Sequence, residues 1–252
     1  MRATLTAISN MAYTKKTMLQ ERPLGYMSLT LLGGMFVGFG VILLVTIGGL
    51  LDPAGVPSMR ILQGVTFGVA LTMVIMAGAD LFTGNNLVMT IGRLEGATTA
   101  TDLIKVWTVS WFGNFLGSII GALLYYYSGL HEGAIGQYIV KLAQYKIDHS
   151  FLELVMRGVL CNIFVCLAVF CAYKLNNEAA KILVIFCCIF PFITSGFEHS
   201  VANMTLFSMT YLIDSAAVPV TNIFHNLIPV SIGNAIGGAL FVGLAFWLPN
   251  RR

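Results

Sequence analysis

The side chains best suited to chemistry lie in two short segments that interrupt long apolar stretches. Residues 78–85 read GADLFTGN and residues 196–203 read GFEHSVAN, so both follow the pattern Gly, any residue, acid, three residues, small residue, Asn. Asp80 and Glu198 are the only acids deep within apolar stretches, and such a group is a functional candidate by default. His199, whose imidazole exchanges protons near neutral pH, occurs in the second segment only. The pattern therefore predicts hydrogen bonding to a small polar solute, proton exchange with it, or both.

Each interruption must satisfy the backbone groups that it frees. A broken helix in a bilayer is tolerated only where its backbone is buried in protein or faces a watery cavity. Gly78 and Gly196 open the two segments, and we expect Gly84 to supply conformational freedom. Asn85 and Asn203 are suited to bond the freed backbone groups locally. The two acids have a structural interpretation, in which each accepts hydrogen bonds from its own break, beside the functional one.

The asymmetry of the two segments points to His199. Leu81 occupies the matching position of the first segment, whereas the acid and the Asn recur. The plain interpretation is a neutral histidine hydrogen-bonded within the core. The broken helix and the neighbouring Glu198 favour a functional one. Helix N-termini at such breaks direct partial positive charge toward the middle of the protein, which favours an anion.

The composition places the chain in a lipid bilayer. Hydrophobic residues make up 57%, charged residues 10%, and the mean hydropathy is +0.84. Soluble domains carry about 25% charged residues, so the sequence predicts a polytopic membrane protein with no nucleic-acid partner. The five cysteines and four histidines show no metal-ligand spacing. We therefore expect no metal and no cofactor.

Six apolar segments are long enough to cross a bilayer, which needs about 20 residues. They cover residues 27–51, 62–92, 104–128, 152–174, 181–213 and 224–248. The second and the fifth are too long for one simple span, and they contain the two interruptions. We divide the single transmembrane domain 1–252 into an N-terminal segment 1–26, a first repeat 27–128, an outer loop 129–151, a second repeat 152–248 and a tail 249–252.

The distribution of basic residues predicts the orientation. Ten Lys and Arg residues fall on the side of the termini and four on the other, so both termini are expected in the cytoplasm. A second repeated pair, FGNFLG at 112–117 and IGNAIG at 232–237, supports an internal duplication. Three spans in each half is an odd number, which makes the two repeats inverted. The N-terminal segment is interpreted as an interfacial helix or as a flexible tail.

The two interruptions resemble the signatures of the formate/nitrite transporter family. The resemblance lies in LFTGN at 81–85 after an acid, GFEHSVANM at 196–204, and NLIPV leading to Gly-Asn within 226–234. It covers essentially the whole chain. It implies an aquaporin-like protomer with its own pore, a homopentamer in the cell membrane, and small monovalent anions such as formate, nitrite and hydrosulfide as substrates. Asp80 departs from the Glu of many members, and Gly84 from the Ser of some formate channels; among the branches, the chain looks most like the hydrosulfide channels.

The resemblance also implies roles for individual residues. His199 is similar to the central pore histidine, with Thr83 facing it, and Glu198 is its neighbour. Lys146 is similar to an outer-loop lysine that attracts the anion. Asn162 and Asn234 resemble polar residues near the vestibules, and Val165 a pore-lining position. Apolar residues match two constrictions, namely Phe67, Leu71, Leu81, Phe82 and Phe192. From the residues alone, ordinary packing between spans explains these apolar side chains equally well.

Other functions leave different traces. A water or glycerol channel of the aquaporin type would carry an Asn-Pro-Ala box at each break, and neither break has one. A membrane enzyme needs a nucleophile–base pair or a metal cluster, which the Glu-His pair alone does not provide. A sensor or scaffold that conducts nothing stays open. A proton-coupled symporter of weak acids uses the same residues as a channel. We therefore predict a non-enzymatic anion channel, with the symporter as the alternative.

Overall fold

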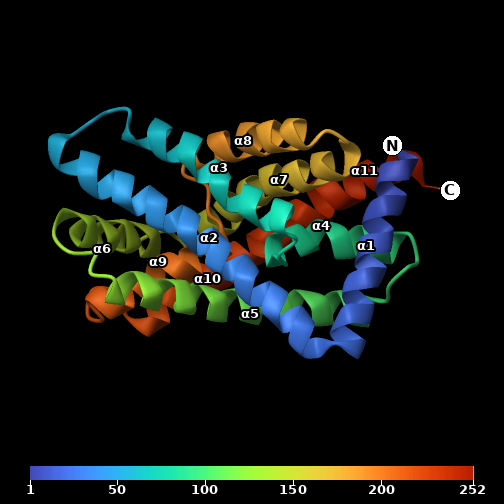
Figure 1. Ribbon diagram of the computed structural model, residues 1–252, viewed down its shortest axis with the longest axis horizontal. Helices are drawn as coiled ribbons and strands as arrows, with labels where there is room; N and C mark the ends of the chain where they lie inside the picture. Colours follow the sequence, from blue (N-terminus) through green and yellow to red (C-terminus); the bar gives the residue numbers. More distant parts are fainter. Residues whose placement is uncertain (252) are drawn as a thin grey trace.

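The computed structural model describes residues 1–251, which form helices joined by short connections (Figure 1). The elements are α1 (Arg2–Glu21), α2 (Pro23–Leu51), η1 (Asp52–Ala54), α3 (Met59–Ala77), α4 (Phe82–Leu94), α5 (Ala100–Tyr127), α6 (Ala134–Ile147), α7 (Phe151–Lys174), α8 (Glu178–Thr194), α9 (Ser200–Ile213), α10 (Val220–Ile236), the π-helix η2 (Gly237–Leu244), α11 (Ala245–Trp247) and η3 (Leu248–Asn250). The chain is therefore an all-helical membrane protein, as its composition predicts.

Local sequence signals set where several helices begin. Pro23 occupies the first turn of α2, where its missing N–H costs nothing. A capping box of Thr99 and Asp102 starts α5, and a second one, of Ser150 and Glu153, starts α7. In each box the hydroxyl accepts from the third helical N–H while the acid accepts from the cap residue, so two free donors are satisfied together.

The two long apolar segments are each divided into two helices. The segment 62–92 becomes α3 and α4, and the segment 181–213 becomes α8 and α9. Gly78 and Gly196 end the first helix of each pair with φ of 74° and 78°. This left-handed backbone suits glycine, which lacks a Cβ. Within the described residues, five helices are long and apolar enough to cross a membrane alone, and α8 and α9 fall below that length.

Two helices lie outside the expected spans. The N-terminal segment forms α1, which crosses the end of the bundle where both termini lie (Figure 1). This excludes the flexible-tail interpretation. The predicted outer loop 129–151 contains the 14-residue helix α6, at the opposite end. The hydropathy pattern does not predict α6, because this helix carries Lys141 and Lys146 and is too short to span a bilayer.

Close helix packing holds together the helices within each half of the bundle. A Cβ at Gly117 on α5 would lie 2.0 Å from the Leu31 carbonyl oxygen of α2. A Cβ at Gly233 on α10 would likewise lie 2.1 Å from the Val155 carbonyl oxygen of α7. Both contacts require glycine, and small residues allow such close approach between membrane helices. The pairs α2–α5 and α7–α10 thus frame the two breaks.

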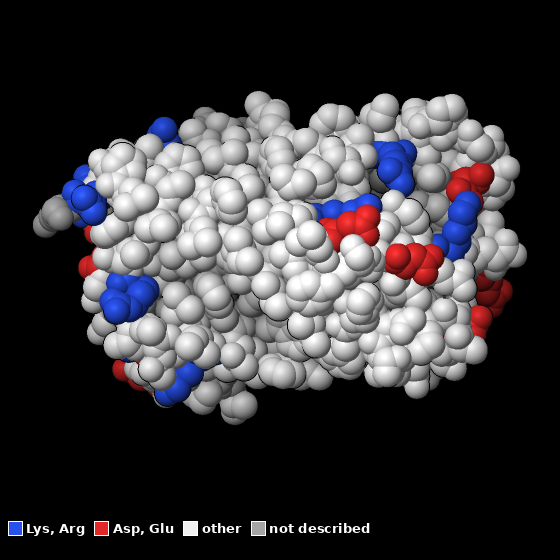
Figure 2. Space-filling model, turned by 180° about the vertical axis from the view of Figure 1, so that it is seen from behind, with Lys and Arg blue, Asp and Glu red and all other residues white. Residues whose placement is uncertain are grey.

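Charged side chains cover little of the protein surface in Figure 2. A band without charged residues separates those at one end from those spread over the opposite half, where one blue and red pair comes close to the middle. Many large apolar residues are exposed, including Leu116, Leu124 and Leu183. This distribution matches a protein whose middle lies in hydrocarbon and whose ends face water.

Candidate functional site

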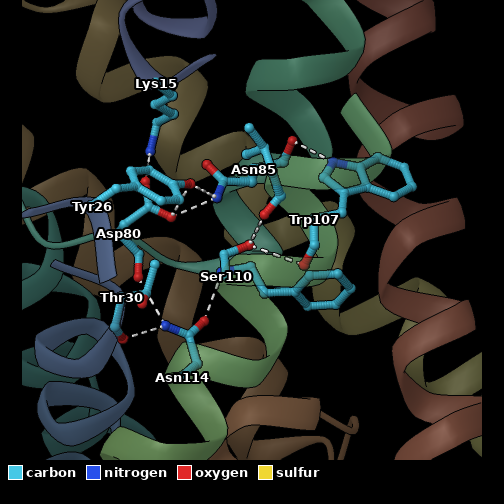
Figure 3. Close-up of polar contacts among 10 residues, drawn as sticks. Lys15, Tyr26, Thr30, Asp80, Asn85, Trp107, Ser110 and Asn114 are labelled. Carbon is cyan, nitrogen blue, oxygen red and sulfur yellow. Dashed lines mark hydrogen bonds and ion pairs between the residues drawn. The ribbon is translucent and has the colours of Figure 1, made fainter. Parts of the chain in front are cut away.

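The first break, between α3 and α4, is organised around the Asp80 carboxylate (Figure 3). Asp80 pairs with the Lys15 ammonium group of α1 and accepts hydrogen bonds from Tyr26 Oη at 3.0 Å and Asn85 Nδ2 at 2.6 Å. Asp80 is 2% exposed, so its charge is buried and needs these partners. Trp107 Nε1 donates to the Asn85 carbonyl at 2.9 Å and fixes the start of α4 against α5.

Asn114 of α5 satisfies the backbone of this break (Figure 3). Its Nδ2 donates to the carbonyls of Thr30 at 2.7 Å and Asp80 at 2.9 Å, and its Oδ1 accepts from the Phe82 N–H at 2.8 Å. The N–H of Asp80 donates to the Leu29 carbonyl of α2 at 3.0 Å. One buried amide therefore bonds the backbone on both sides of the break.

The second break, between α8 and α9, repeats this arrangement. Glu198 accepts from Lys146 Nζ of α6 at 2.6 Å and from Asn203 Nδ2 at 2.6 Å. Asn234 of α10 donates to the Glu198 carbonyl at 3.0 Å and accepts from the Ser200 N–H at 3.0 Å. In each break a lysine and an asparagine thus bond one buried carboxylate. Lys15 and Lys146 are equally shielded, with side chains 16% exposed.

Several expected roles at the breaks are wrong. Asn85 and Asn203 bond the acid side chains rather than free backbone groups. The acids accept from side chains, so they do not cap their own breaks. Gly84 lies within α4 and supplies no unusual backbone conformation; the positive φ values belong to the glycines that open the segments. Asn162 and Asn234 are fully buried and bond backbone groups, and their expected place near the vestibules stays a prediction.

The N-termini of α4 and α9 meet at Thr83 and His199. Thr83 Oγ1 lies 3.1 Å from His199 Nε2, and both residues are buried. His199 is also the N-cap of α9, because its Nδ1 accepts from the Ala202 N–H at 3.2 Å. A ring nitrogen that accepts cannot carry a proton, so a neutral His199 holds its proton on Nε2 and donates to Thr83. This hydrogen bond is a direct contact between the two breaks.

Two cavities lie on either side of this contact. One, of about 350 Å³, is lined by Lys15, Leu71 and Leu81. The other, of about 340 Å³, is lined by Lys146, Phe192 and His199, among others. Each cavity therefore combines a lysine with residues expected at a constriction. Phe67 and Phe192 contact each other edge to face in the second cavity, with ring centroids 6.0 Å apart.

The remaining candidates pack around the same centre. Phe82 begins α4 and contacts the Trp107 ring edge to face, with centroids 6.5 Å apart. Val165 is buried on α7 in the apolar cluster that also holds Leu71 and Phe192. Within residues 1–251, no group of three or more His, Cys, Asp or Glu side chains is arranged to hold a metal ion.

A cluster of titratable groups borders the second cavity at the α6 end. Arg157 Nη1 lies 2.7 Å from His149 Nε2, and the Tyr145 ring packs edge-on against His149. Burial lowers the pKa of His149, and the positive charge of Arg157 lowers it further. The hydrogen bond from Arg157 lowers the pKa of Tyr145. The Arg157 carbonyl accepts from the Glu198 N–H at 3.2 Å, which connects this cluster to the second break.

Three residues of the first break were not predicted from the sequence. Lys15 and Tyr26 reach Asp80 from the N-terminal region, across separations of 65 and 54 residues. Asn114 belongs to the repeated motif FGNFLG, whose counterpart contains Asn234. The repeat of Gly-Asn in both halves was the available signal, because a polar residue beside glycines in an apolar span has to bond something at close range.

Fold and site together define a polytopic membrane protein in which two broken helices meet between two cavities. The family model described as formate/nitrite transporter matches residues 3–248. The chain is 40% identical to the nitrite transporter NirC of Escherichia coli K12 over 229 residues, which cover 90% of this chain and 84% of that protein. It is 34% identical to the formate channel FocA of the same organism over 251 residues, covering 90% and 87%. The chain belongs to the formate/nitrite transporter family, which confirms the resemblance.

Solved structures agree with this assignment. An ion channel of the same family is 36% identical, with a TM-score of 0.93 over 99% of both chains. A pentameric formate channel with formate bound is 27% identical, with a TM-score of 0.77 over 90% of this chain and 97% of that one. These relatives are transporters and channels rather than enzymes. Their names mention nitrite and formate, so the expected preference for hydrosulfide gains no support from them.

Proposed function

We propose that this protein is a channel for small monovalent weak-acid anions, with nitrite and formate as the substrates to test first. The observation that carries the proposal is the Thr83–His199 contact, where two half-helix N-termini meet between two cavities that each contain a lysine. The nitrite and formate relatives support this choice of anions. Hydrosulfide, a weak-acid anion of similar size, is a third substrate for comparison.

The mechanism begins with attraction of the anion. Lys15 and Lys146 place a positive charge in each cavity, and a buried carboxylate neutralises each of these charges in part. An entering anion is therefore attracted to the lysine without being bound too tightly to leave. The helix N-termini add partial positive charge at the centre. The lysine charges and the helix N-termini together offset the free-energy cost of removing water from the anion. This cost is nominally about 20 kcal/mol, and several kcal/mol once the protein relaxes around the ion.

At the centre we assign His199 the role of a neutral hydrogen-bond donor. Its Nδ1 caps α9, so protonating that nitrogen breaks the bond from the Ala202 N–H. The Nε2–H group can donate to the passing anion in place of Thr83, while the apolar constrictions at Phe192 and Leu71 limit the size of the anion that passes. The rival mechanism has His199 lend a proton, so that the neutral acid crosses the constrictions.

Two variants separate these mechanisms. His199→Asn keeps an N–H donor but cannot titrate, whereas His199→Phe has neither property. In proteoliposomes, the donor role predicts measurable nitrite and formate flux in His199→Asn with the pH dependence of the wild type, and loss of flux in His199→Phe. Loss of flux in both variants would instead support proton lending.

A proton-coupled symporter is the second candidate. The Lys146–Glu198 pair borders the cavity that His199 lines, which gives coupled proton binding a physical location. The two functions differ in energetics. Uptake of nitrite against its gradient, driven only by an inward proton gradient, would establish the symporter. Dissipation of the nitrite gradient without accumulation is expected for the channel.

The finer architecture belongs to the same proposal. We propose six spans in two inverted repeats, an aquaporin-like protomer, and both termini in the cytoplasm of the cell. The equivalent bonds of Asn114 and Asn234 support the repeat. The pentameric neighbour supports assembly as a homopentamer. Cross-linking in membranes should give a ladder that ends at five subunits, and protease should cleave the termini only from the cytoplasmic side.

A further inference from the structure

Asn162 of α7 is fully buried, and its amide connects two helices. Its Nδ2 donates to the carbonyls of Asn234 at 2.6 Å and Thr83 at 3.2 Å, and it lies 3.0 Å from Asn86 Oδ1. Because all three neighbours are acceptors, the amide nitrogen and not the oxygen has to face them. The side chain therefore links the start of α4 to α10 in a single orientation.

The contacts of Asn162 complete a closed circuit of hydrogen bonds that includes the Thr83–His199 contact. Asn234 bonds the two residues that flank His199, through the Glu198 carbonyl and the Ser200 N–H. Thr83 in turn contacts His199 Nε2 at 3.1 Å. The circuit runs from the Thr83 carbonyl to Asn162, then to Asn234, and from Asn234 to the Glu198 carbonyl and the Ser200 N–H on either side of His199. The contact between the His199 imidazole and the Thr83 hydroxyl completes it.

The first half of the chain has no such side chain. The position that corresponds to Asn162 in the first half is Gly34. Asn234 bonds the Gly158 carbonyl of α7, four residues before Asn162, and Asn114 bonds the Thr30 carbonyl of α2, four residues before Gly34. A Cβ at Gly34 would lie 2.0 Å from the Asn114 carbonyl oxygen, so the helices touch there directly. The polar link is thus specific to the half that carries the histidine.

We propose that Asn162 is a positioning residue that sets the separation of Thr83 and His199, and through it the selectivity among small anions. This inference rests on the proposed channel function. Without Asn162, the Thr83 carbonyl loses its connection to α10, and only its contact with Cys166 Sγ at 3.2 Å still holds it to α7. The start of α4 keeps its bonds to Asn114 and Trp107 of α5, but without the link to α10 its distance from His199 can change.

The test compares anion ratios rather than total flux. Wild-type protein, Asn162→Ala and the near-isosteric Asn162→Leu are reconstituted in liposomes, and the fluxes of nitrite, formate and acetate are measured. We expect the acetate-to-nitrite ratio to rise about threefold to tenfold in both variants, the factor that one net hydrogen bond represents. Cys166→Ala, which loses a contact with the same carbonyl but keeps the circuit of hydrogen bonds, should change the ratio less than about twofold.

A double-mutant cycle identifies the route of the effect. If Asn162 acts through Thr83, adding Asn162→Ala to Thr83→Val should change the ratio no further, because the hydroxyl being positioned is already gone. Additive effects would overturn the proposal. So would an unchanged ratio with a uniform fall in all fluxes, or failure of both Asn162 variants to fold, since either assigns the residue to general stability. A wild-type protein that carries no anion would contradict the proposed function first, and an active wild type with unshifted variants only the positioning role.

Discussion

Replacing Asn234 by leucine should destabilise the second break and disturb the pore together. The substitution removes hydrogen bonds to the Gly158 carbonyl at 2.8 Å, the Glu198 carbonyl at 3.0 Å and the Ser200 N–H at 3.0 Å. Ser200 is fully buried, so its N–H at the start of α9 loses its partner with no water to replace it.

The size of the loss follows from two bounds. Hydrogen bonds within membrane proteins average about 0.6 kcal/mol, so three of them contribute about 2 kcal/mol. A buried donor left without a partner costs about 1–3 kcal/mol, which sets the upper range. We therefore predict that Asn234→Leu lowers the free energy of unfolding by about 2–4 kcal/mol. Asn114→Leu, which loses the matching three bonds, should lose a similar amount.

The assay is reversible unfolding in mixed micelles with increasing SDS, followed by circular dichroism. Asn10→Leu, at an exposed position of α1, is the matched control and should unfold near the wild-type midpoint. The nitrite flux then distinguishes the roles of the two breaks. Asn234→Leu should lose the flux because Asn234 holds the backbone on both sides of His199, whereas Asn114→Leu should retain more of it. A midpoint for Asn234→Leu equal to that of the control would refute the role of the amide.

Further variants test the cavities and their rim. Burial and the charge of Arg157 favour the neutral form of His149. Its contribution to stability is therefore complete above the unfolded pKa of about 6.5 and is lost as pH falls through the lower pKa of the folded protein. His149→Gln should weaken this pH dependence of the unfolding midpoint, and the same pH dependence in the variant and the wild type would contradict the prediction. Lys146→Met leaves Glu198 buried without its cation and should cost about 3–5 kcal/mol, with recovery when Glu198→Gln is added; no recovery would mean that the pair is not coupled. Phe192→Ala removes the aromatic ring that stacks on His199, so it should widen the apolar constriction and raise acetate flux relative to formate flux. An unaltered substrate range would show that Phe192 does not form the constriction.

Repetition in the sequence located the breaks, but it did not assign their bonds. A glycine followed by an acid and an asparagine, twice within apolar stretches, predicts where two helices stop. The asparagine nearest in sequence was expected to bond the free backbone. The structure gives that role to Asn114 and Asn234 on other helices, because the close glycine contacts of α5 and α10 bring these amides against the breaks. Such proximity depends on tertiary packing.

The sequence did not predict the cation that pairs with either acid. A family resemblance singled out Lys146, but as a residue that attracts the anion and not as the partner of Glu198. Lys15 was missed because residues 1–26 were expected to lie outside the bundle. In the structure α1 folds against α4 and brings Lys15 to Asp80, 65 residues away in sequence. A lysine in an amphipathic N-terminal helix has no local signal for such a contact. The buried acid, by contrast, does signal that some cation has to reach it.

The most direct test of the channel assignment is anion flux in liposomes containing the purified protein, with wild type and His199→Phe compared at equal protein density. We predict rapid entry of nitrite and formate through the wild type, exclusion of larger anions, and loss of flux when the imidazole is replaced. Wild-type flux no faster than that of protein-free liposomes, or undiminished flux in His199→Phe, would contradict a pore centred on Thr83 and His199.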